Sequence, residues 1–308
     1  MKRLVIIDGH AILHRAYHAF PTSLKTRKGE LVNAAYGFTR ILLSVLDDLK
    51  PDYLAVAFDL PEPTFRHKEY VGYQVHRPKT DEELIDQISR VYQIVEALNI
   101  PIFTKPTFEA DDVIGTLAKQ ASKKGVETII VTGDKDIMQL VDDKVKVYLP
   151  SRGVQDAEIY NHKRVKNKLG VTPSQIIDYK ALVGDSSDNY PGIPGIGPKT
   201  AVNLLNQYQN LANIFKNVKN LKPLVSQKIE QGKESGLLSQ KLARIVINVS
   251  VKLNLRACQV HDYDHQKVAD LFGELEFKSL LKRLPGYQIS DFSDKEKKKK
   301  DDRQISLL

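Results

Sequence analysis

Three short runs of sequence decide the fold: LVIID over residues 4–8, YLAVAFD over residues 53–59 and TIIVTGD over residues 128–134. Each run is apolar, has the length of a strand, and ends in an aspartate. Stretches with helical periodicity separate the runs, and such alternation is typical of a sheet whose strands run parallel. We therefore predict an α/β domain with a mostly parallel sheet over residues 1–171.

The connecting stretches carry helix signals. Residues 34–49 and 109–124 place apolar side chains at helical spacing. Thr80 and Glu83 have the spacing of a capping box, which predicts that a helix starts at this point. Residues 145–149 are expected to form an edge strand or a strand next to the edge.

In the second half of the chain the strand signals largely stop. Thr172 followed by Pro173, and later Pro198, each mark the start of a helix. Further helices are predicted at residues 224–231, 235–248 and 266–284. A second, helical domain is therefore expected over residues 172–286, and the polar residues 287–308 are expected to be a disordered tail.

The composition narrows the class of protein. The 308 residues include one cysteine, Cys258, so no internal disulfide can form, which fits a reducing cytoplasm. The apolar runs are far shorter than the roughly 20 residues of a membrane helix, and the N-terminus lacks the pattern of a secretory signal. Because the chain is long enough to bury its own core, we expect a cytoplasmic monomer that spans no membrane.

The net charge of +8 is concentrated in one stretch. Residues 195–256 contain ten Lys or Arg against two acids, Glu230 and Glu234, which leaves 36 charges of each sign elsewhere. Such a basic stretch can form a surface that binds the phosphates of a nucleic acid. The alternative is a basic helix face that is merely solvated.

Nine acids lie where the predicted elements would bring them together. The aspartates that end the three runs should meet at one rim of the sheet, because ligands bind at the carboxyl ends of parallel strands. The candidate metal ligands are Asp8, Asp59, Glu109, Asp111, Asp112, Asp134, Asp136, Asp185 and Asp188. Any one of them alone could be only a cap or turn residue. Together, without basic partners, they would repel one another unless cations bind, and oxygen ligands favour Mg²⁺ or Mn²⁺.

A glycine-rich segment, GIPGIGPKTA at residues 192–201, leads into the predicted helix at Pro198. Its Gly-hydrophobic-Gly spacing and the helix that follows are the signature of a helix-hairpin-helix, and a plain loop before a helix is the alternative. Backbone N–H groups at a helix N-terminus bind phosphate without reading the base. The residues expected to bind DNA are Gly192, Gly195, Gly197, Lys199 and Thr200.

Eight strings together resemble the 5′-nuclease family, which comprises the 5′–3′ exonuclease domain of bacterial DNA polymerase I and the flap endonucleases. The strings are Ile7-Asp8-Gly9-His10, Tyr36-Gly37-Phe38, Ala57-Phe58-Asp59, Phe65-Arg66-His67, Glu109-Ala110-Asp111-Asp112, Thr132-Gly133-Asp134-Lys135-Asp136, Gly184-Asp185-Ser186-Ser187-Asp188-Asn189 and Pro194-Gly195-Ile196-Gly197. They cover about residues 4–285. No polymerase module follows, so we expect a free-standing exonuclease.

The resemblance implies a resolvase-like (PIN-like) sheet domain, a helical arch at about residues 65–100, and a helix-3-turn-helix DNA-binding unit whose hairpin also holds K⁺. It implies that the nine acids hold two or more divalent ions beside the scissile phosphate, and that Arg15 lies near this phosphate. We expect Arg66 and Arg77 to steer phosphates. We expect Tyr73 either to stack on a base or simply to pack.

The arch departs from the family pattern at one position. The family usually reads Tyr-Lys-x-x-Arg, with the lysine reaching the reacting phosphate, whereas this chain reads Tyr73-Gln74-Val75-His76-Arg77. Loss of such a donor typically costs on the order of 10² to 10³ in rate. We therefore expect slower turnover, unless His76, Arg77 or Lys79 takes over the role.

These features predict a divalent-metal-dependent 5′–3′ exonuclease and flap endonuclease, which cuts DNA near single-strand/duplex junctions as in primer or flap removal during replication and repair. Two alternatives stay open. One is a DNA-binding paralogue with weak or no activity, although a pure binder would gain nothing from nine acids placed against phosphate. The other is a phosphatase for small substrates, which would need neither the hairpin nor the basic surface.

Overall fold

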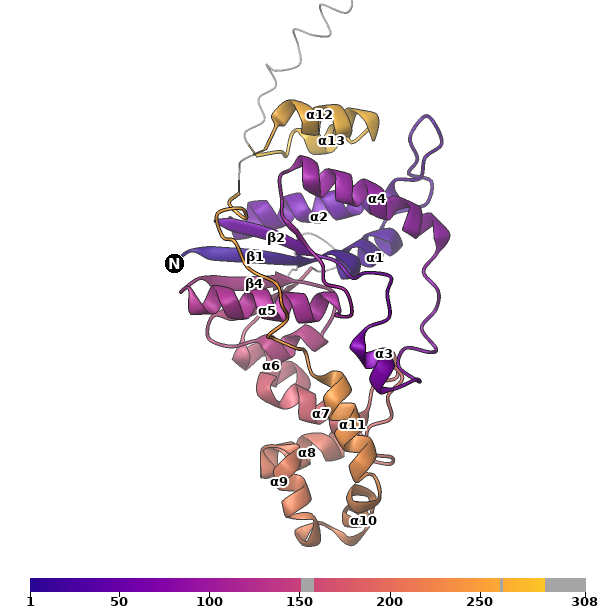
Figure 1. The fold of residues 1–308 in the computed structure, drawn as a ribbon, viewed down its shortest axis with the longest axis vertical. Coiled ribbons are helices and arrows are strands. Elements are labelled where there is room, and N and C mark those ends of the chain that lie inside the picture. Colours follow the sequence, from indigo (N-terminus) through magenta and orange to yellow (C-terminus); the bar gives the residue numbers. More distant parts are fainter. Residues whose placement is uncertain (151–157, 261–262, 286–308) are drawn as a thin grey trace, which may run out of the picture.

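A computed structural model describes residues 1–150, 158–260 and 263–285 of the protein. These residues form a sheet covered by helices on both faces, with a helical unit that extends from one side of it (Figure 1). The predicted tail, residues 287–308, lies outside the described residues. None of the helices in the described part of the chain combines the length and apolarity needed to span a membrane.

One six-stranded sheet organises the first half of the chain. The strands are β1 (Arg3–Asp8), β2 (Tyr53–Ala57), β3 (Ile102–Phe103), β4 (Glu127–Val131), β5 (Val145–Leu149) and β6 (Glu158–Tyr160). Their order is β3-β2-β1-β4-β5-β6, and every neighbouring pair is parallel except β5 with β6. This confirms the predicted α/β class. Because β1 lies between β2 and β4, the aspartates that follow these three strands emerge side by side at one rim.

Helices cover both faces of the sheet. They are α1 (Gly9–Ala19), α2 (Asn33–Leu49), α4 (Glu82–Ala97), α5 (Ala110–Lys123) and α6 (His162–Leu169), with a 3₁₀ turn, η1, at Asp136–Leu140. The short helix α3 (Phe65–Glu69) lies away from the sheet (Figure 1). Val5 and Ile7 of β1 pack into the same core as α1, α2 and α4, whereas Leu4 and Ile6 pack into the core that contains α5. The alternation follows from the two-residue repeat of a strand.

The segment predicted to be an arch stands clear of the sheet over only part of its length. α4 begins at Glu82 with Asp81 as its N-cap, so the predicted capping box of Thr80 and Glu83 is wrong. The apolar face of α4 is buried against α2 and the sheet. Of the segment predicted to be an arch, only residues 65–81 therefore lie outside the layers that cover the sheet (Figure 1).

The helical unit follows at the C-terminal side of α6. It consists of η2 (Pro173–Gln175), α7 (Ile176–Val183), α8 (Pro198–Tyr208), α9 (Leu211–Lys216), η3 (Val218–Asn220), α10 (Pro223–Gln231) and α11 (Lys233–Ala243). The predicted helix at residues 235–248 is thus five residues too long at its C-terminal end. Beyond α11 the chain runs without helix along α5, where Gln120 Nε2 donates to Val251 O and Gln120 Oε1 accepts from Leu253 N, both at 2.8 Å.

The last two helices pack on the sheet domain rather than on the helical unit. α12 (His265–Glu274) and α13 (Lys278–Leu281) lie beside α2 and α4, where Phe272 and Phe277 are buried (Figure 1). The described residues 244–260 and 263–285 therefore pack against the sheet domain in space. The buried phenylalanines complete a core formed by helices more than 160 residues earlier in the chain, which no local pattern shows.

Candidate active site

Asp8 stands at the centre of the acidic rim, because it ends β1 and caps α1. Its Oδ1 accepts a hydrogen bond from Ala11 N at 3.1 Å, and its Oδ2 accepts one from Thr132 Oγ1 at 2.6 Å. Burial raises the pKa of the Asp8 carboxyl to about 7 against the opposing hydrogen bond from Thr132, and the charges of Asp59 and Asp134 add to the rise. Asp8 therefore favours either a proton or a nearby cation.

The N-terminus of α5 brings further acids to the same rim. Asp59, which follows β2, accepts a hydrogen bond from Ala110 N at 2.7 Å and so joins the two elements. Burial raises the pKa of Asp111 well above its usual range, and the charges of Asp134 and Asp8 raise it further. Asp8, Asp59, Asp111 and Asp134, here called the inner acids, thus act on one another electrostatically.

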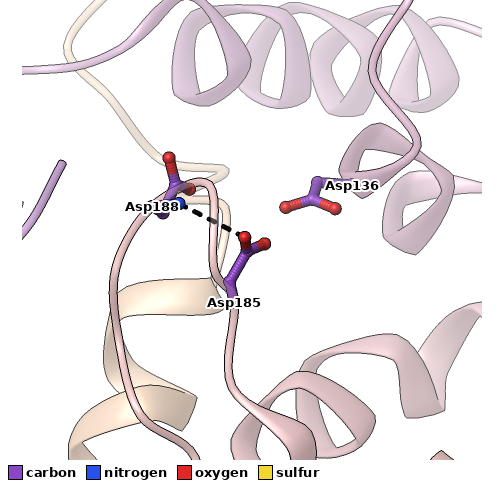
Figure 2. A group of neighbouring side chains, drawn as sticks. All are labelled: Asp136, Asp185 and Asp188. Atoms are coloured by element: carbon purple, nitrogen blue, oxygen red, sulfur yellow. Dashed lines mark hydrogen bonds between the residues drawn. The ribbon is translucent and has the colours of Figure 1, made fainter. Parts of the chain in front are cut away.

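A second group of acids lies between η1 and the loop after α7. Asp136, Asp185 and Asp188, here called the outer acids, each offer an oxygen, and these oxygens lie within 4.8 Å of one another (Figure 2). Two backbone hydrogen bonds between Asp185 and Tyr190, of 2.8 and 3.0 Å, close the loop. The charge of Asp134 adds to burial in raising the pKa of Asp136 to about 6, which connects the outer acids to the inner ones.

Lys180 lies among the outer acids, although none of the acidic sequence motifs contains it. Its ammonium group donates to Asp136 Oδ2 at 2.5 Å and also to Asp185 Oδ2. Burial would raise the pKa of Asp185, but the hydrogen bonds from Lys180 and Ser187 outweigh burial and lower it. The expectation that the acids lack basic partners is therefore wrong here. The available signal was a lysine in the last turn of α7, five residues before Asp185.

The turn after α3 rests on Asp188. Gln74 Nε2 donates to Asp188 Oδ1 at 2.8 Å, and the backbone N–H of Gln74 donates to Asp188 O at 2.9 Å. Tyr73 is 3% exposed, and its hydroxyl lies 3.4 Å from Glu109 Oε2 and 3.3 Å from Asp188 Oδ2. Its ring is packed inside the protein in this structure.

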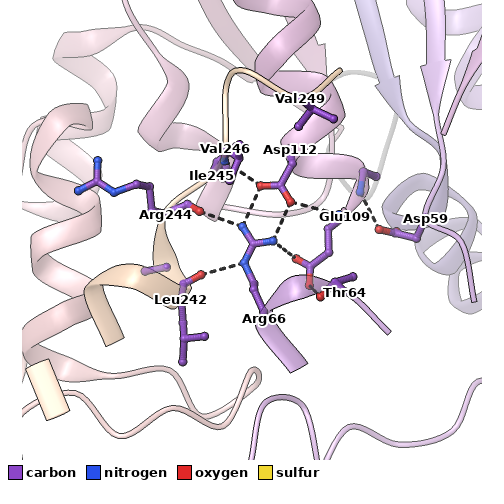
Figure 3. A network of polar contacts seen from close by, with 12 residues as sticks. Asp59, Thr64, Arg66, Glu109, Asp112, Leu242, Arg244, Ile245, Val246 and Val249 are labelled. Carbon is purple, nitrogen blue, oxygen red and sulfur yellow. Dashed lines mark hydrogen bonds and ion pairs between the residues drawn. The ribbon is translucent and has the colours of Figure 1, made fainter. Parts of the chain in front are cut away.

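Arg66 and Asp112 form a buried ion pair (Figure 3). Arg66 is 2% exposed and Asp112 is fully buried. Arg66 also contacts Glu109, with 3.2 Å between Nη1 and Oε2. Burial raises the pKa of Glu109 to about 7, although the charge of Arg66 lowers it. This arrangement differs from the expectation that Arg66 meets DNA phosphates and Asp112 a metal ion, because each side chain is turned to the other inside the protein.

The remaining predicted side chains lie at or near α1. Arg77 is exposed, and Arg15 is half-buried on α1. Burial lowers the pKa of His10 and of His14, and the charge of Arg77 contributes to both shifts, so Arg77 lies near the start of α1. His10, the second residue of α1, accepts a hydrogen bond at Nδ1 from Asp59 N at 3.1 Å.

The glycine-rich segment connects α7 with α8, directly after the loop of the outer acids. Gly192 has φ +63°, and a Cβ there would lie 2.1 Å from Gly184 N, so only glycine lets the two ends of the acid loop meet. Gly195, Gly197 and Lys199 are exposed and Thr200 is half-buried at the start of α8. The same segment thus positions both the outer acids and the N-terminus of α8.

Two family models match consecutive parts of the chain. The 5′–3′ exonuclease N-terminal resolvase-like domain matches residues 3–170, and the 5′–3′ exonuclease C-terminal SAM fold matches residues 171–266. The chain belongs to the 5′–3′ exonuclease family. A relative of this exonuclease chain is DNA polymerase I of Bacillus subtilis (strain 168), which is 39% identical over 284 residues, or 92% of this chain and 32% of the relative. The chain therefore spans about a third of the length of that relative.

Solved structures share the fold of this exonuclease chain. A bacteriophage T5 flap endonuclease in a complex with DNA and metal ions has a TM-score of 0.67 at 19% identity, covering 89% of this chain and 100% of that one. The catalytic core of Rad2 in complex with DNA has a TM-score of 0.60 at 16% identity, covering 92% of each chain. These likenesses confirm the predicted order of a resolvase-like sheet domain and a helical unit.

Proposed function

We propose that this chain is a divalent-metal-dependent 5′–3′ exonuclease and structure-specific flap endonuclease. It would hydrolyse DNA phosphodiesters near single-strand/duplex junctions, as in primer or flap removal during replication and repair. The observation that carries the proposal is that the inner acids, the outer acids and the hairpin between α7 and α8 lie next to one another in the structure. A carboxylate-lined rim and a phosphate-binding helix start are thereby placed next to each other.

The donor set fits hard divalent cations. The inner and the outer acids all offer carboxylate oxygens, which suit Mg²⁺ or Mn²⁺. The raised pKa values of Asp8, Asp111 and Asp136 show that uncompensated negative charge is unfavourable there. We propose two or more ions, held by the inner acids, the outer acids and Glu109, on whose carboxyl the charges of Asp59 and Asp188 act. Such ions activate water and stabilise the attacking and leaving oxygens of an in-line displacement.

The chain's own residues would bind and orient the DNA. The exposed start of α8, with Gly195, Gly197 and Lys199, would hold the backbone of the duplex without reading its bases. Arg77 and Arg15 near α1 would meet the phosphate that approaches the inner acids. Two solved structures of the same fold, the T5 flap endonuclease and the catalytic core of Rad2, are complexes with DNA, which supports DNA as the partner.

The hairpin is also the proposed K⁺ site. Its carbonyl oxygens would be the ligands, and one of them, Gly195 O, accepts a hydrogen bond from Lys228 Nζ at 3.1 Å. K⁺ would therefore compete with the Lys228 ammonium group at this oxygen. We further propose that the protein acts as a monomer in the cytoplasm, which agrees with its single cysteine.

A labelled flap substrate tests the proposal. The protein is incubated with a 5′-labelled DNA flap and Mg²⁺, with EDTA and with Asp134→Asn as controls. A nuclease releases short labelled products, and both controls abolish them. Binding of the flap without any cut would instead identify a DNA-binding paralogue. Release of inorganic phosphate from p-nitrophenyl phosphate, without cutting of the flap, would identify a phosphatase.

A further inference from the structure

We infer that Arg66 and Asp112 are positioning residues, which hold Glu109 and the base of the arch against the end of α11, and that neither contacts DNA or metal. The inference rests on the proposed function, because Glu109 belongs to the proposed metal site. It rests also on a complete account of the hydrogen bonds that the two side chains make.

Each nitrogen of the Arg66 guanidinium has a partner inside the protein. Nε donates to Leu242 O at 2.9 Å, and Nη2 donates to Arg244 O at 2.9 Å and to Asp112 Oδ1 at 2.9 Å. Nη1 lies 2.7 Å from Asp112 Oδ2 and 3.2 Å from Glu109 Oε2. A guanidinium group has five N–H donors, and four of them are used in hydrogen bonds, while Nη1 is also in ion-pair contact with Glu109. Because Arg66 is also only 2% exposed, its guanidinium offers no open face to a phosphate.

The acceptor positions of Asp112 are filled in the same way. Its Oδ1 accepts from Arg66 Nη2 and, at 2.8 Å, from Val246 N. Its Oδ2 accepts from Arg66 Nη1 and, at 3.1 Å, from Glu109 N. An ionised carboxylate has about four lone-pair positions, so none is left for a metal ion. The side chain is also fully buried, which leaves a cation no approach to it.

The pair joins three parts of the chain that are far apart in sequence (Figure 3). Arg66 lies in α3 at the base of the arch, Asp112 lies in the first turn of α5, and residues 242–246 span the C-terminal end of α11. Glu109, the N-cap of α5, is held twice: its backbone N–H by Asp112 and its carboxylate by Arg66. The pair thus supplies the charged contact to the Glu109 carboxylate, which also accepts from the hydroxyls of Thr64 and Tyr73.

Neighbouring aspartates provide a matched test of the metal role. Asp111→Asn and Asp112→Asn each remove one negative charge from the first turn of α5. Binding of Mn²⁺ to the full chain without DNA is measured by electron paramagnetic resonance. We expect Asp111→Asn to lose an ion or at least about ten-fold in affinity, whereas Asp112→Asn keeps the wild-type number of ions and lowers only the Tm. Loss of an ion in Asp112→Asn would overturn the inference.

Arg66→Lys tests the positioning role with the charge retained. A lysine cannot make the five contacts, so Glu109 should lose its orientation. We expect the single-turnover rate of flap cleavage to fall by about ten-fold, with the affinity for the flap in EDTA unchanged within about two-fold. Arg90→Lys, which alters an ion pair with Glu30 on the other face of the sheet, is the control and should change neither quantity. Weaker flap binding without a slower cut would instead assign Arg66 to the DNA.

A double-mutant cycle separates positioning from simple stability. In a Glu109→Gln background, Arg66→Lys should cost less than about three-fold, because the group that it positions is already altered. A merely structural arginine would slow both backgrounds equally, and that result would overturn the inference. If Asp112→Asn does not fold, the double-mutant cycle by itself tests the inference. If wild type does not cut the flap, the proposed function is wrong, but Mn²⁺ binding and the Tm of Asp112→Asn still test whether Asp112 binds metal.

Discussion

The inner and the outer acids balance their negative charge in different ways. Among the described residues, none of the inner acids forms an ion pair with lysine or arginine, and burial raises the pKa values of Asp8 and Asp111. Of the outer acids, Asp136 and Asp185 share Lys180. The inner acids therefore depend on cations from solution to neutralise their negative charge. The outer acids are partly neutralised by Lys180, which belongs to the protein itself. Two halves of one site can thus differ in how much they need metal to be stable.

The largest expected effect is that of Asp8→Asn. Cleavage of the flap should fall by at least about 100-fold. In EDTA at pH 8, however, the variant should be more stable than wild type by roughly 2 kcal/mol, because a buried and unpaired charge is removed. Chemical denaturation and single-turnover cleavage measure the two effects.

Asp185→Asn is the matched variant in the outer half. It removes a partner of Lys180, so it should destabilise the metal-free protein. If both aspartate variants shifted the free energy of unfolding in the same direction, the distinction between the halves would be lost.

Lys180→Gln should leave the outer acids without a lysine or arginine partner in the described part of the chain, as the inner acids are. The change leaves Asp136 and Asp185 without their ammonium partner, and we expect a loss of about 2 kcal/mol in EDTA. Mg²⁺ should restore most of this loss. Lys146→Gln breaks a more exposed pair with Glu127 and is the control, with an expected loss below about 1 kcal/mol and no rescue by Mg²⁺. Equal losses without rescue would contradict the account of Lys180 as a counter-ion.

The charge of the inner acids should also make the free energy of unfolding depend on pH. The folded pKa of Asp8 lies above the unfolded value, so the folded state binds the proton more tightly. Its contribution to stability is present below the unfolded pKa of about 4 and is lost as the pH rises to about 7. The unfolding free energy of wild type, minus that of Asp8→Asn, should therefore fall by up to about 1.4 kcal/mol for each unit by which the pH rises in this window. Denaturation in EDTA from pH 5 to 8 measures it, and a flat difference would exclude Asp8 as its source.

The smallest expected effect is that of Gln74→Lys, at the turn that rests on Asp188. A lysine would bring positive charge to the outer half, but Asp188 would neutralise part of it, since Gln74 already donates to that carboxylate. We expect the single-turnover rate at saturating DNA to rise by about ten-fold. His76→Lys adds the same charge to an exposed neighbour and should have less effect. A rate no higher than that of wild type would mean that another group, such as Arg77, already fills the role.

Local patterns were sufficient for the features that depend on neighbours in sequence. Apolar runs that end in acids predicted the strands, and the geometry of parallel sheets then predicted one rim for Asp8, Asp59 and Asp134. The hairpin was predictable because its glycines are needed by the backbone itself, as the positive φ of Gly192 shows. Even a local signal can fail, however, since Thr80 has the capping spacing and yet does not cap α4.

Features that depend on distant partners were not predictable. Arg66 is 46 residues from Asp112, and Lys180 is 44 residues from Asp136. Nothing in the sequence around either basic residue tells which acid it will meet. The early end of α11 has the same origin, because Leu242 O, Arg244 O and Val246 N bind side chains of the sheet domain instead of continuing the helix.

The amino-acid sequence alone determined the sheet, its acidic rim and the glycine hairpin, since hydrophobic periodicity and backbone freedom are properties of adjacent residues. The tertiary structure alone decided which of those acids are left unpaired and which are neutralised from within. Whether a charge is buried, and what lies beside it, depends on how distant segments pack, and this packing sets the electrostatic energy of each carboxylate.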